Sequence, residues 1–375
     1  MKIKLNLYSI IIVSCILFLP QVLNAQSDGY KTKTVDVQKG GNLEMKVLYG
    51  DIIVTTWDKN QVLVKYEYDE DTGEAISVVK SGNTVTITSN QEANSDQYEL
   101  SIPSNFNINL ITQGGNIDLR SDLTGTVKIS TAGGDITLKK VNGDVKLSTA
   151  GGNIRTGDLR GKIELKTAGG DIKLGTVGIG SVKTAGGNIY VESSEKSLKI
   201  HTAGGNVKIG NVGGEIEILT GGGNVNVGTA KGSAILKSGG GNISLNGASG
   251  KVEVKTGGGN IGLTNISGSV EAKTGAGDVN LELNPAGNTI VKTAYGNITL
   301  FLSPDAKATV VALVRSSTWM DESDKGPSDI TSDFPATTFD KKGSGLDAVY
   351  QINGGGDKIE LVTQSGKIDI KKKNK

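Results

Sequence analysis

The sequence predicts an all-β protein that folds as a parallel β-solenoid with about 18 residues in each coil. Three observations support this fold class: a short phrase recurs at a nearly fixed spacing, apolar residues alternate at the same place in each copy, and glycines precede the alternating stretches. Irregular β segments are expected to cap both ends, because the edges of a solenoid would otherwise expose unpaired backbone groups.

The recurring phrase is Thr-Ala-Gly-Gly-Asn/Asp-Ile, which passes into glycine-rich variants later in the chain. Its first residue is found at Thr112, Thr131, Thr149, Thr167, Thr184, Thr202, Thr220, Ser238, Thr256, Thr274 and Thr293. Successive copies begin 17 to 19 residues apart. A period of this length is typical of repeat architectures, in which each unit buries its apolar face only by stacking on its neighbours.

One copy shows how a coil should fold. Apolar and polar residues alternate in two short stretches of residues 131–148, with apolar positions at Ile136, Leu138, Val145 and Leu147. Alternation with a period of two predicts half-buried strands. Glycines precede both stretches, at Gly133, Gly134 and Gly143. We expect these glycines to adopt the positive φ angles of sharp corners.

An antiparallel meander or sandwich is the alternative fold, since short strands joined by Asn-Gly or Gly-Asp also resemble hairpins. A hairpin array, however, would not require the same residue at every eighteenth position. The fixed register of the repeat therefore favours the solenoid.

The composition divides the chain into four regions. Residues 1–25 combine a basic start, an apolar run and a small-residue end, as in a secretory signal peptide. Residues 26–111 should form an N-terminal β segment that leads into and caps the solenoid. The regular coils should span 112–300. Residues 301–375 should add C-terminal coils and a cap, with an irregular loop at 315–345.

The same features predict export to the periplasm, the cell surface or the extracellular medium. The single cysteine, Cys15, lies in the leader, where it faintly resembles a lipoprotein signal; ordinary cleavage after Ala25 fits better, because four more apolar residues follow Cys15. No second apolar run follows, so no transmembrane anchor is expected in the mature chain. Without the two lysines of the leader, 38 basic residues face 39 acidic ones. This balance favours neither nucleic acid nor anionic lipid as a partner.

Two polar columns accompany each corner. The first contains Asn116, Asp135, Asn153, Asp171, Asn188, Asn206, Asn224, Asn242, Asn260, Asp278 and Asn297. Calcium sites need converging carboxylates, and only three members are Asp. We therefore expect these residues to bond the backbone of their own turn and of the stacked neighbour. The threonines should form a stacked hydroxyl ladder rather than an ice-binding surface.

A third column places lysine before the threonine, at Lys166, Lys183, Lys237, Lys255, Lys273 and Lys292. These lysines could bind an acidic polysaccharide or a phosphate chain. Glutamates nevertheless lie two residues earlier on the same strand face, at Glu164, Glu253 and Glu271. A solvated face of mixed charge is the expected arrangement.

No catalytic, cofactor-binding or metal-ligating residues are predicted, and we expect the chain not to be an enzyme. His201 is the only histidine, and no nucleophile motif or metal-ligand spacing is present in the sequence. The alternative is a carbohydrate-active β-helix enzyme, a polysaccharide lyase or hydrolase. Such enzymes place their acids and bases on long loops, whereas the coils from 112 to 300 contain almost no insertions.

The loop at 315–345 combines aromatic and acidic residues: Trp319, Met320, Phe334 and Phe339 with Asp321, Glu322, Asp324, Asp329, Asp333 and Asp340. Such a loop suits a cap over the last coil or a contact site for a partner. After it, Thr363 to Ile368 match the register of the repeat, which predicts a final coil.

The repeated Thr-x-x-Gly-Asn/Asp-Ile/Val-x-Leu/Val units from Thr112 to Leu300 resemble the bacterial putative adhesin family, a domain of unknown function with glycine-rich β-strand repeats. The stretch Tyr49-Gly50-Asp51-Ile52-Ile53-Val54, with Trp57-Asp58, resembles the opening of that family. The resemblance implies a cell-envelope or surface protein without defined catalytic residues. We therefore expect a non-catalytic adhesin or binding scaffold, whose unknown partner could be a surface glycan or an envelope protein.

Overall fold

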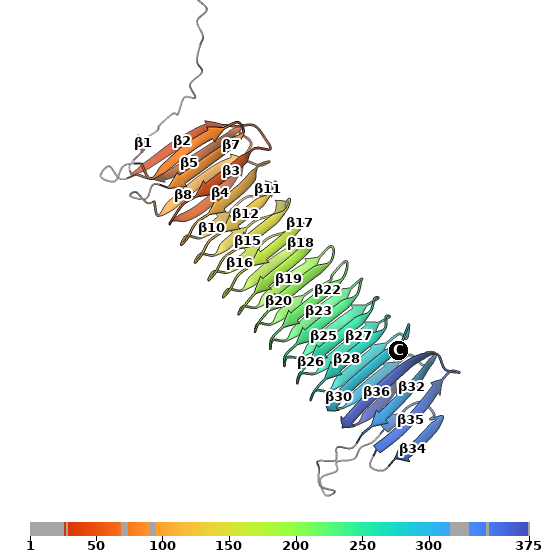
Figure 1. The fold of residues 1–375 in the computed structure, drawn as a ribbon. Coiled ribbons are helices and arrows are strands. Elements are labelled where there is room, and N and C mark those ends of the chain that lie inside the picture. The colour runs from red at the N-terminus through yellow and green to blue at the C-terminus, as the bar shows by residue number, and fades with distance from the viewer. Residues whose placement is uncertain are drawn as a thin grey trace, which may run out of the picture.

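The computed structural model describes residues 26–27, 29–68, 74–89, 95–315, 330–342 and 345–373. These residues wind into a long rod of β-strands, and none of them lies in a helix (Figure 1). The predicted all-β solenoid is confirmed. Within this described part, no helix is long and apolar enough to cross a membrane. The predicted signal peptide, residues 1–25, lies outside the described residues.

The coils stack through parallel pairing of equivalent strands. Ile136 pairs with Ile117 of the preceding coil and with Ile154 of the following coil. Later coils repeat this register, as in the pairing of Val225 with Ile243. Between residues 112 and 300, every pairing between described strands is parallel, so the antiparallel meander or sandwich is wrong.

Two parallel sheets run along the rod. The first sheet follows the Asn/Asp corner, and its outward side is called the first face below. It contains β4 (Asp51–Trp57), β10 (Ile117–Leu119), β13 (Ile136–Leu138), β16 (Ile154–Thr156), the start of β18 (Ile172–Thr184), β19 (Ile189–Ser194), β21 (Val207–Ile209), β23 (Val225–Ala230), β25 (Ile243–Ala248), β27 (Ile261–Ile266), β29 (Val279–Leu283), β31 (Ile298–Leu302) and β37 (Ile368–Lys372).

The second sheet precedes the next threonine, and its outward side is called the second face. It contains β3 (Asn42–Lys46), β9 (Asn107–Ile111), β12 (Val127–Ser130), β15 (Val145–Ser148), β17 (Leu159–Lys166), the end of β18, β20 (Leu198–Thr202), β22 (Ile216–Thr220), β24 (Ala234–Ser238), β26 (Val252–Thr256), β28 (Val270–Thr274), β30 (Thr289–Tyr295) and β36 (Asp357–Ser365). In the early coils, the chain passes from the first sheet to the second through the short strands β11 (Leu123–Thr124) and β14 (Val141–Asn142), which pair with each other in parallel.

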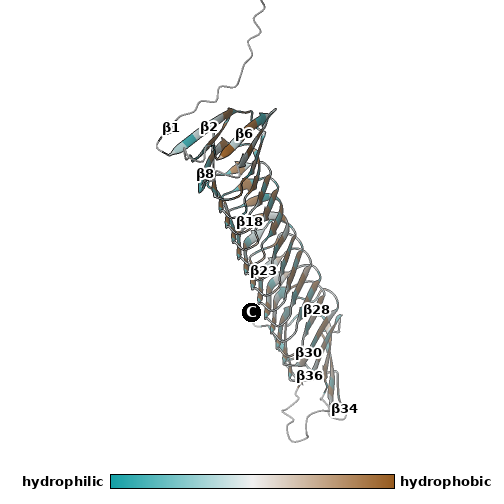
Figure 2. Cartoon of the chain, turned by 60° about the vertical axis from the view of Figure 1, so that its left-hand side comes forward, coloured by the Kyte–Doolittle hydropathy of each residue, from teal (hydrophilic) through white to brown (hydrophobic). Residues whose placement is uncertain are grey.

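Aliphatic side chains from both sheets fill the space between them. Every second residue of a strand points inward, so that Ile172, Leu174, Val225 and Val227 are at most 1% exposed. Figure 2 shows the resulting alternation, with hydrophobic colour recurring in the strands along the rod. The core is therefore a set of aliphatic columns parallel to the axis, and each polar substitution inside it would leave a group without hydration.

At the N-terminal end, additional strands from residues 26–103 pair with the first coil and cover its open edge. That coil is β3 and β4, which pair on one side with β9 and β10. On the other side they pair with β7 (Thr84–Ser89) and β8 (Gln97–Pro103). The antiparallel strands β6 (Ile76–Ser81), β5 (Gln61–Glu67) and β2 (Tyr30–Asp36) follow, and β1 (Gln26–Ser27) pairs with β2. Tyr66, Tyr98 and Phe106 are fully buried there.

The C-terminal end has a comparable insertion. β30 and β31 pair with β36 and β37, the last coil in the sequence, with Thr293 opposite Thr363 as the register predicts. The earlier strands β32 (Ala308–Val314) and β33 (Ile330–Ser332) lie beyond that coil. The antiparallel strands β35 (Gly345–Ile352) and β34 (Thr338–Lys342) complete this end.

The prediction of an irregular loop throughout 315–345 is wrong for its second part. β33 and β34 lie within it because their backbone groups pair with β37 and β35. Phe334 packs against the core at 8% exposure, whereas Phe339 is 54% exposed. Asp333 accepts a hydrogen bond from the backbone of Lys372. Trp319, Met320, Asp321, Glu322, Asp324 and Asp329 lie outside the described residues.

Candidate functional site

The Asn/Asp column is a ladder that joins the coils. Each side-chain Oδ1 accepts a hydrogen bond from the backbone N–H of the equivalent residue one coil later, over 2.7 to 3.0 Å. The ladder begins at Asp51 and ends where Asn297 accepts from Lys367 N–H at 2.9 Å. Burial would raise the pKa of Asp135, but hydrogen bonds from Asn153 and Arg155 outweigh it and lower that pKa. The predicted bonding to the stacked neighbour is therefore present.

The threonine column is buried and bonds the backbone. Thr167 is 7% exposed. Its hydroxyl donates to Gly152 O of the preceding coil at 2.8 Å and accepts from Gly170 N–H at 3.2 Å. The predicted hydroxyl ladder thus needs correction: the hydroxyls stack, but each bonds a carbonyl and an amide rather than another hydroxyl.

The corner glycines are required for space rather than for positive φ. Gly133 and Gly134 do not have positive φ, contrary to prediction, although Gly143 does, at 159°. A Cβ on Gly134 would lie 2.0 Å from Gly115 O of the coil below. The same collision recurs at the glycine directly before the Asn or Asp of each corner, because the coils stack backbone on backbone at this edge of the rod.

The second face carries paired charges. Glu253 contacts Lys255 at 2.8 Å and Lys237 of the preceding coil at 2.9 Å. Hydrogen bonds from these two lysines lower the pKa of Glu253 to about 2. Five of the six predicted column lysines have a glutamate partner in this way: Lys166, Lys237, Lys255, Lys273 and Lys292. The expected mixed-charge face is confirmed.

A shallow depression of about 360 Å³ lies on this face and is lined in part by Lys199, Glu217, Ile235 and Glu253. It brings acids and bases together, as a glycan-cleaving site would. A general acid, however, needs a raised pKa. The hydrogen bond from Lys199 lowers the pKa of Glu217, and Glu253 is lowered likewise. Both carboxyl groups are therefore held as ionised partners of lysine.

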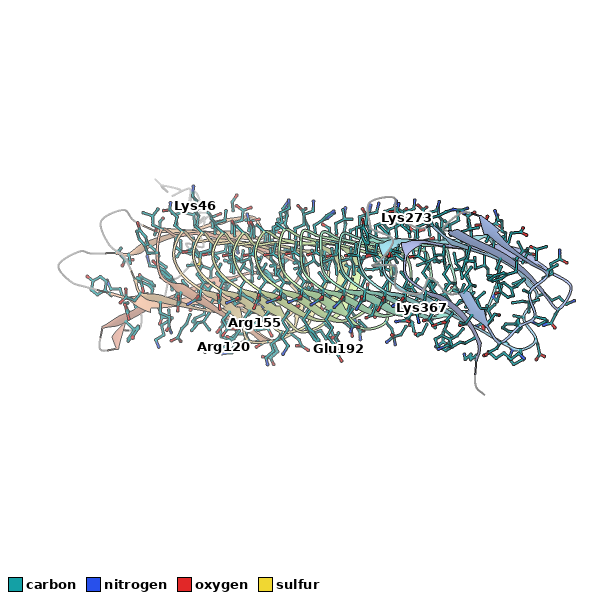
Figure 3. All side chains as sticks on the ribbon, turned by 90° about the horizontal axis from the view of Figure 1, so that it is seen from below. Lys46, Arg120, Arg155, Glu192, Lys273 and Lys367 are labelled. Atoms are coloured by element: carbon teal, nitrogen blue, oxygen red, sulfur yellow. The ribbon has the colours of Figure 1, made fainter. Side chains whose placement is uncertain are left out.

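The first face differs in its outward column, which reads Thr137, Arg155, Lys173, Tyr190, Lys208, Asn226 and Ser244. The exposed Tyr190 lies between Lys173 and Lys208, with their Nζ atoms 5.9 and 6.0 Å from its ring centroid. The sequence placed these residues in one outward column, but it did not reveal that this tyrosine has a cation on each side. Figure 3 shows Arg155 and Glu192 along one edge of the rod and Lys273 along the opposite edge.

The only histidine of the chain, His201, lies on one of the two outward faces. Across the described residues, no group of three or more His, Cys, Asp and Glu side chains is arranged to hold a metal ion. His201 lies on the second face between Lys183 and Leu219, and its buried Nδ1 has no hydrogen-bond partner. We take the pair of long outward faces as the candidate functional site.

A family model described as Toastrack DUF4097 matches residues 41–234 and again residues 180–371. No curated protein matches the chain. Similar solved structures include a putative adhesin from Parabacteroides distasonis, with 18% identity, TM-score 0.34, and coverage of 64% of this chain and 97% of that chain. A putative adhesin from Bacteroides fragilis has 12% identity, TM-score 0.26, and coverage of 92% and 98%. A putative lipid binding protein from Parabacteroides distasonis has 16% identity, TM-score 0.33, and coverage of 65% and 96%.

Proposed function

The chain belongs to the Toastrack DUF4097 family, and from that premise we propose that it is an exported, non-catalytic binding scaffold of the cell envelope. In this proposal a rigid β-solenoid presents its long faces to a surface glycan or an envelope protein. The role is that of an adhesin or of a docking rod, and the faces rather than a cleft make the contact.

The observation that carries this proposal is the continuity of the two faces. From β10 to β31, strands of two to thirteen residues stack without a long insertion. Hydrogen bonds of the Asn/Asp ladder and of the threonine hydroxyls connect each corner to the equivalent corner of the next coil. A scaffold needs such rigidity, because side chains on successive coils must keep their spacing to meet an extended partner without a large entropic cost of ordering.

The proposal is tested by fractionating cells that express the chain from its own leader and by treating intact cells with protease. We expect the chain in the envelope or medium, shortened by about the 25 predicted leader residues. A full-length chain that stays in the cytoplasm would contradict the proposal.

A carbohydrate-active enzyme remains the second candidate, and the observation that favours it is the depression that contains Glu217 and Glu253. The discriminating experiment incubates the purified chain with acidic and neutral polysaccharides and measures new reducing ends or unsaturated sugars. Product formation that Glu253→Gln abolishes would establish the enzyme and overturn the scaffold.

A further inference from the structure

We propose that Lys173, Tyr190 and Lys208 form a subsite for an acidic glycan on the first face. The inference rests on the proposed function, because it names the class of ligand that such a scaffold would hold. The apolar face of a sugar ring would pack on Tyr190, and the two ammonium groups would bind carboxylate or sulfate groups on the same or adjacent sugars.

The three side chains are aligned by the sheet itself. Lys173 on β18 pairs with Tyr190 on β19, which pairs with Lys208 on β21. Their outward positions therefore follow the rod axis at the usual interstrand spacing of about 4.8 Å. Tyr190 is 40% exposed, so an aromatic ring is presented to solvent between two cations. Among the described tyrosines, only Tyr190 has a lysine on two sides.

The two ammonium groups are available for a ligand. Their distances of 5.9 and 6.0 Å from the ring centroid lie at the outer limit of a cation–π contact. Neither lysine forms an ion pair with any described carboxylate, unlike most lysines of the second face. The neighbouring cation Arg155 is already bound to Asp135 at 2.8 Å.

Two acidic residues lie near the column of Lys173, Tyr190 and Lys208, and neither forms an ion pair with these lysines. Asp171 accepts hydrogen bonds from the backbone and side chain of Asn188, as part of the ladder. Glu192 follows Tyr190 by two residues on the same strand and is exposed. Its carboxylate can accept hydrogen bonds from sugar hydroxyl groups. On the adjacent coils the equivalent positions are Gly175 and Gly210, so no side chain projects on either side of Glu192.

A sugar fits this chemistry better than a nucleic acid. Nucleic-acid binding depends on many phosphate contacts and gains from a basic protein, whereas the mature chain has 38 basic and 39 acidic residues. One ring, two unpaired cations and one carboxylate acceptor instead match a ligand that has apolar C–H faces, hydroxyl groups and widely spaced negative charges.

The test is calorimetric titration of the purified chain with hexasaccharides of galacturonate, hyaluronan and heparin, and with the methyl-esterified galacturonate as the uncharged control. We expect at least one acidic hexasaccharide to bind, and its affinity to fall by about tenfold or more in Tyr190→Thr and in the double variant Lys173→Gln/Lys208→Gln. Tyr190→Phe should retain binding, since the ring and not the hydroxyl makes the contact.

The matched control is Lys196→Gln/Lys231→Gln, which removes two charges from exposed residues that lie outside the strands of either face, and it should bind like the parent chain. Circular dichroism of each variant verifies that the coils are intact. Failure of all three acidic hexasaccharides to bind, equal binding of the methyl ester, or binding that survives the Tyr190→Thr and lysine variants overturns the subsite. Equally tight binding of inorganic polyphosphate without need for Tyr190 also overturns it. If the chain is exported but this titration fails, the subsite is refuted and the proposed function is not.

Discussion

A methyl group added at Gly205 should destabilise the fold strongly, whereas one added at the adjacent Gly204 should not. A Cβ on Gly205 would lie 1.9 Å from Gly187 O and 2.5 Å from the carbonyl carbon of that residue. A Cβ on Gly204 would meet nothing within 4 Å. The two residues share one corner, so Gly205→Ala and Gly204→Ala differ only in whether the methyl group points at the coil below.

The free energy of unfolding lost in Gly205→Ala depends on how far the two stacked coils must separate to make room for the methyl group. Relief of the overlap requires separating two coils at a corner where Thr202 Oγ1 donates to Gly187 O at 3.1 Å and Asn206 N–H donates to Asn188 Oδ1 at 3.0 Å. Overpacking costs about 1–3 kcal/mol and each weakened hydrogen bond about 1 kcal/mol, so we expect a loss of about 3–5 kcal/mol. Gly204→Ala should instead be neutral or stabilise the chain by up to about 1 kcal/mol through the unfolded state.

Equilibrium unfolding in guanidinium chloride, followed by circular dichroism, measures both effects. The slope of the transition must be compared between variants, because long repeat arrays do not always unfold in one step. If Gly205→Ala and Gly204→Ala unfold at the same denaturant concentration, the coils are not stacked as closely as described, and the spatial explanation of the glycine column is refuted.

Three further outcomes follow from the same structure. Ile172→Asp places an uncompensated carboxylate in the core, where Ile172 is 1% exposed, and should lower the free energy of unfolding by about 3 kcal/mol or more, or prevent folding. The control Asn280→Asp, on the exposed first face, should change the free energy of unfolding by less than about 0.5 kcal/mol. The pKa of Glu253 is about 2 in the folded chain and about 4.3 when unfolded, so its stabilising contribution is complete above the unfolded value and is lost as the pH falls through the folded value. Glu253→Gln should therefore flatten the dependence of stability on pH between these values, and an unchanged slope would show that its ion pairs with Lys237 and Lys255 contribute nothing. EDTA should leave the thermal midpoint unchanged, because the Asn/Asp side chains already bond the backbone; a large shift on adding calcium would show that the ladder is a metal site.

Local register was the predictable part of the fold. The spacing of the threonine phrase predicts which residues stack, and the pairing of Thr293 with Thr363 agrees with it. The sequence did not predict that β36 and β37 insert between the coil of β30 and β31 and the earlier strands β32 and β33. Either order buries the same aliphatic columns, so only long-range packing of the whole end decides between them.

The candidate site was less predictable, because it depends on neighbours across coils. Lysine recurs on both faces, and its spacing does not show which lysines are paired. Lys255 is neutralised because Glu253 lies on its own strand, whereas neither Lys173 nor Lys208 forms an ion pair with a described carboxylate. The roles of the corner glycines were also misjudged, since a sequence pattern cannot distinguish a need for positive φ from a need for space.

The central claim is that the rod works outside the cytoplasm as a binding surface, and site-specific labelling tests it most directly. The predicted mature chain contains no cysteine, so Asn280→Cys on the exposed first face introduces a single thiol. A small charged maleimide that cannot cross the cytoplasmic membrane should label this variant in intact cells, and the parent chain should remain unlabelled. Labelling that requires lysis of the cells would place the chain in the cytoplasm and contradict the account.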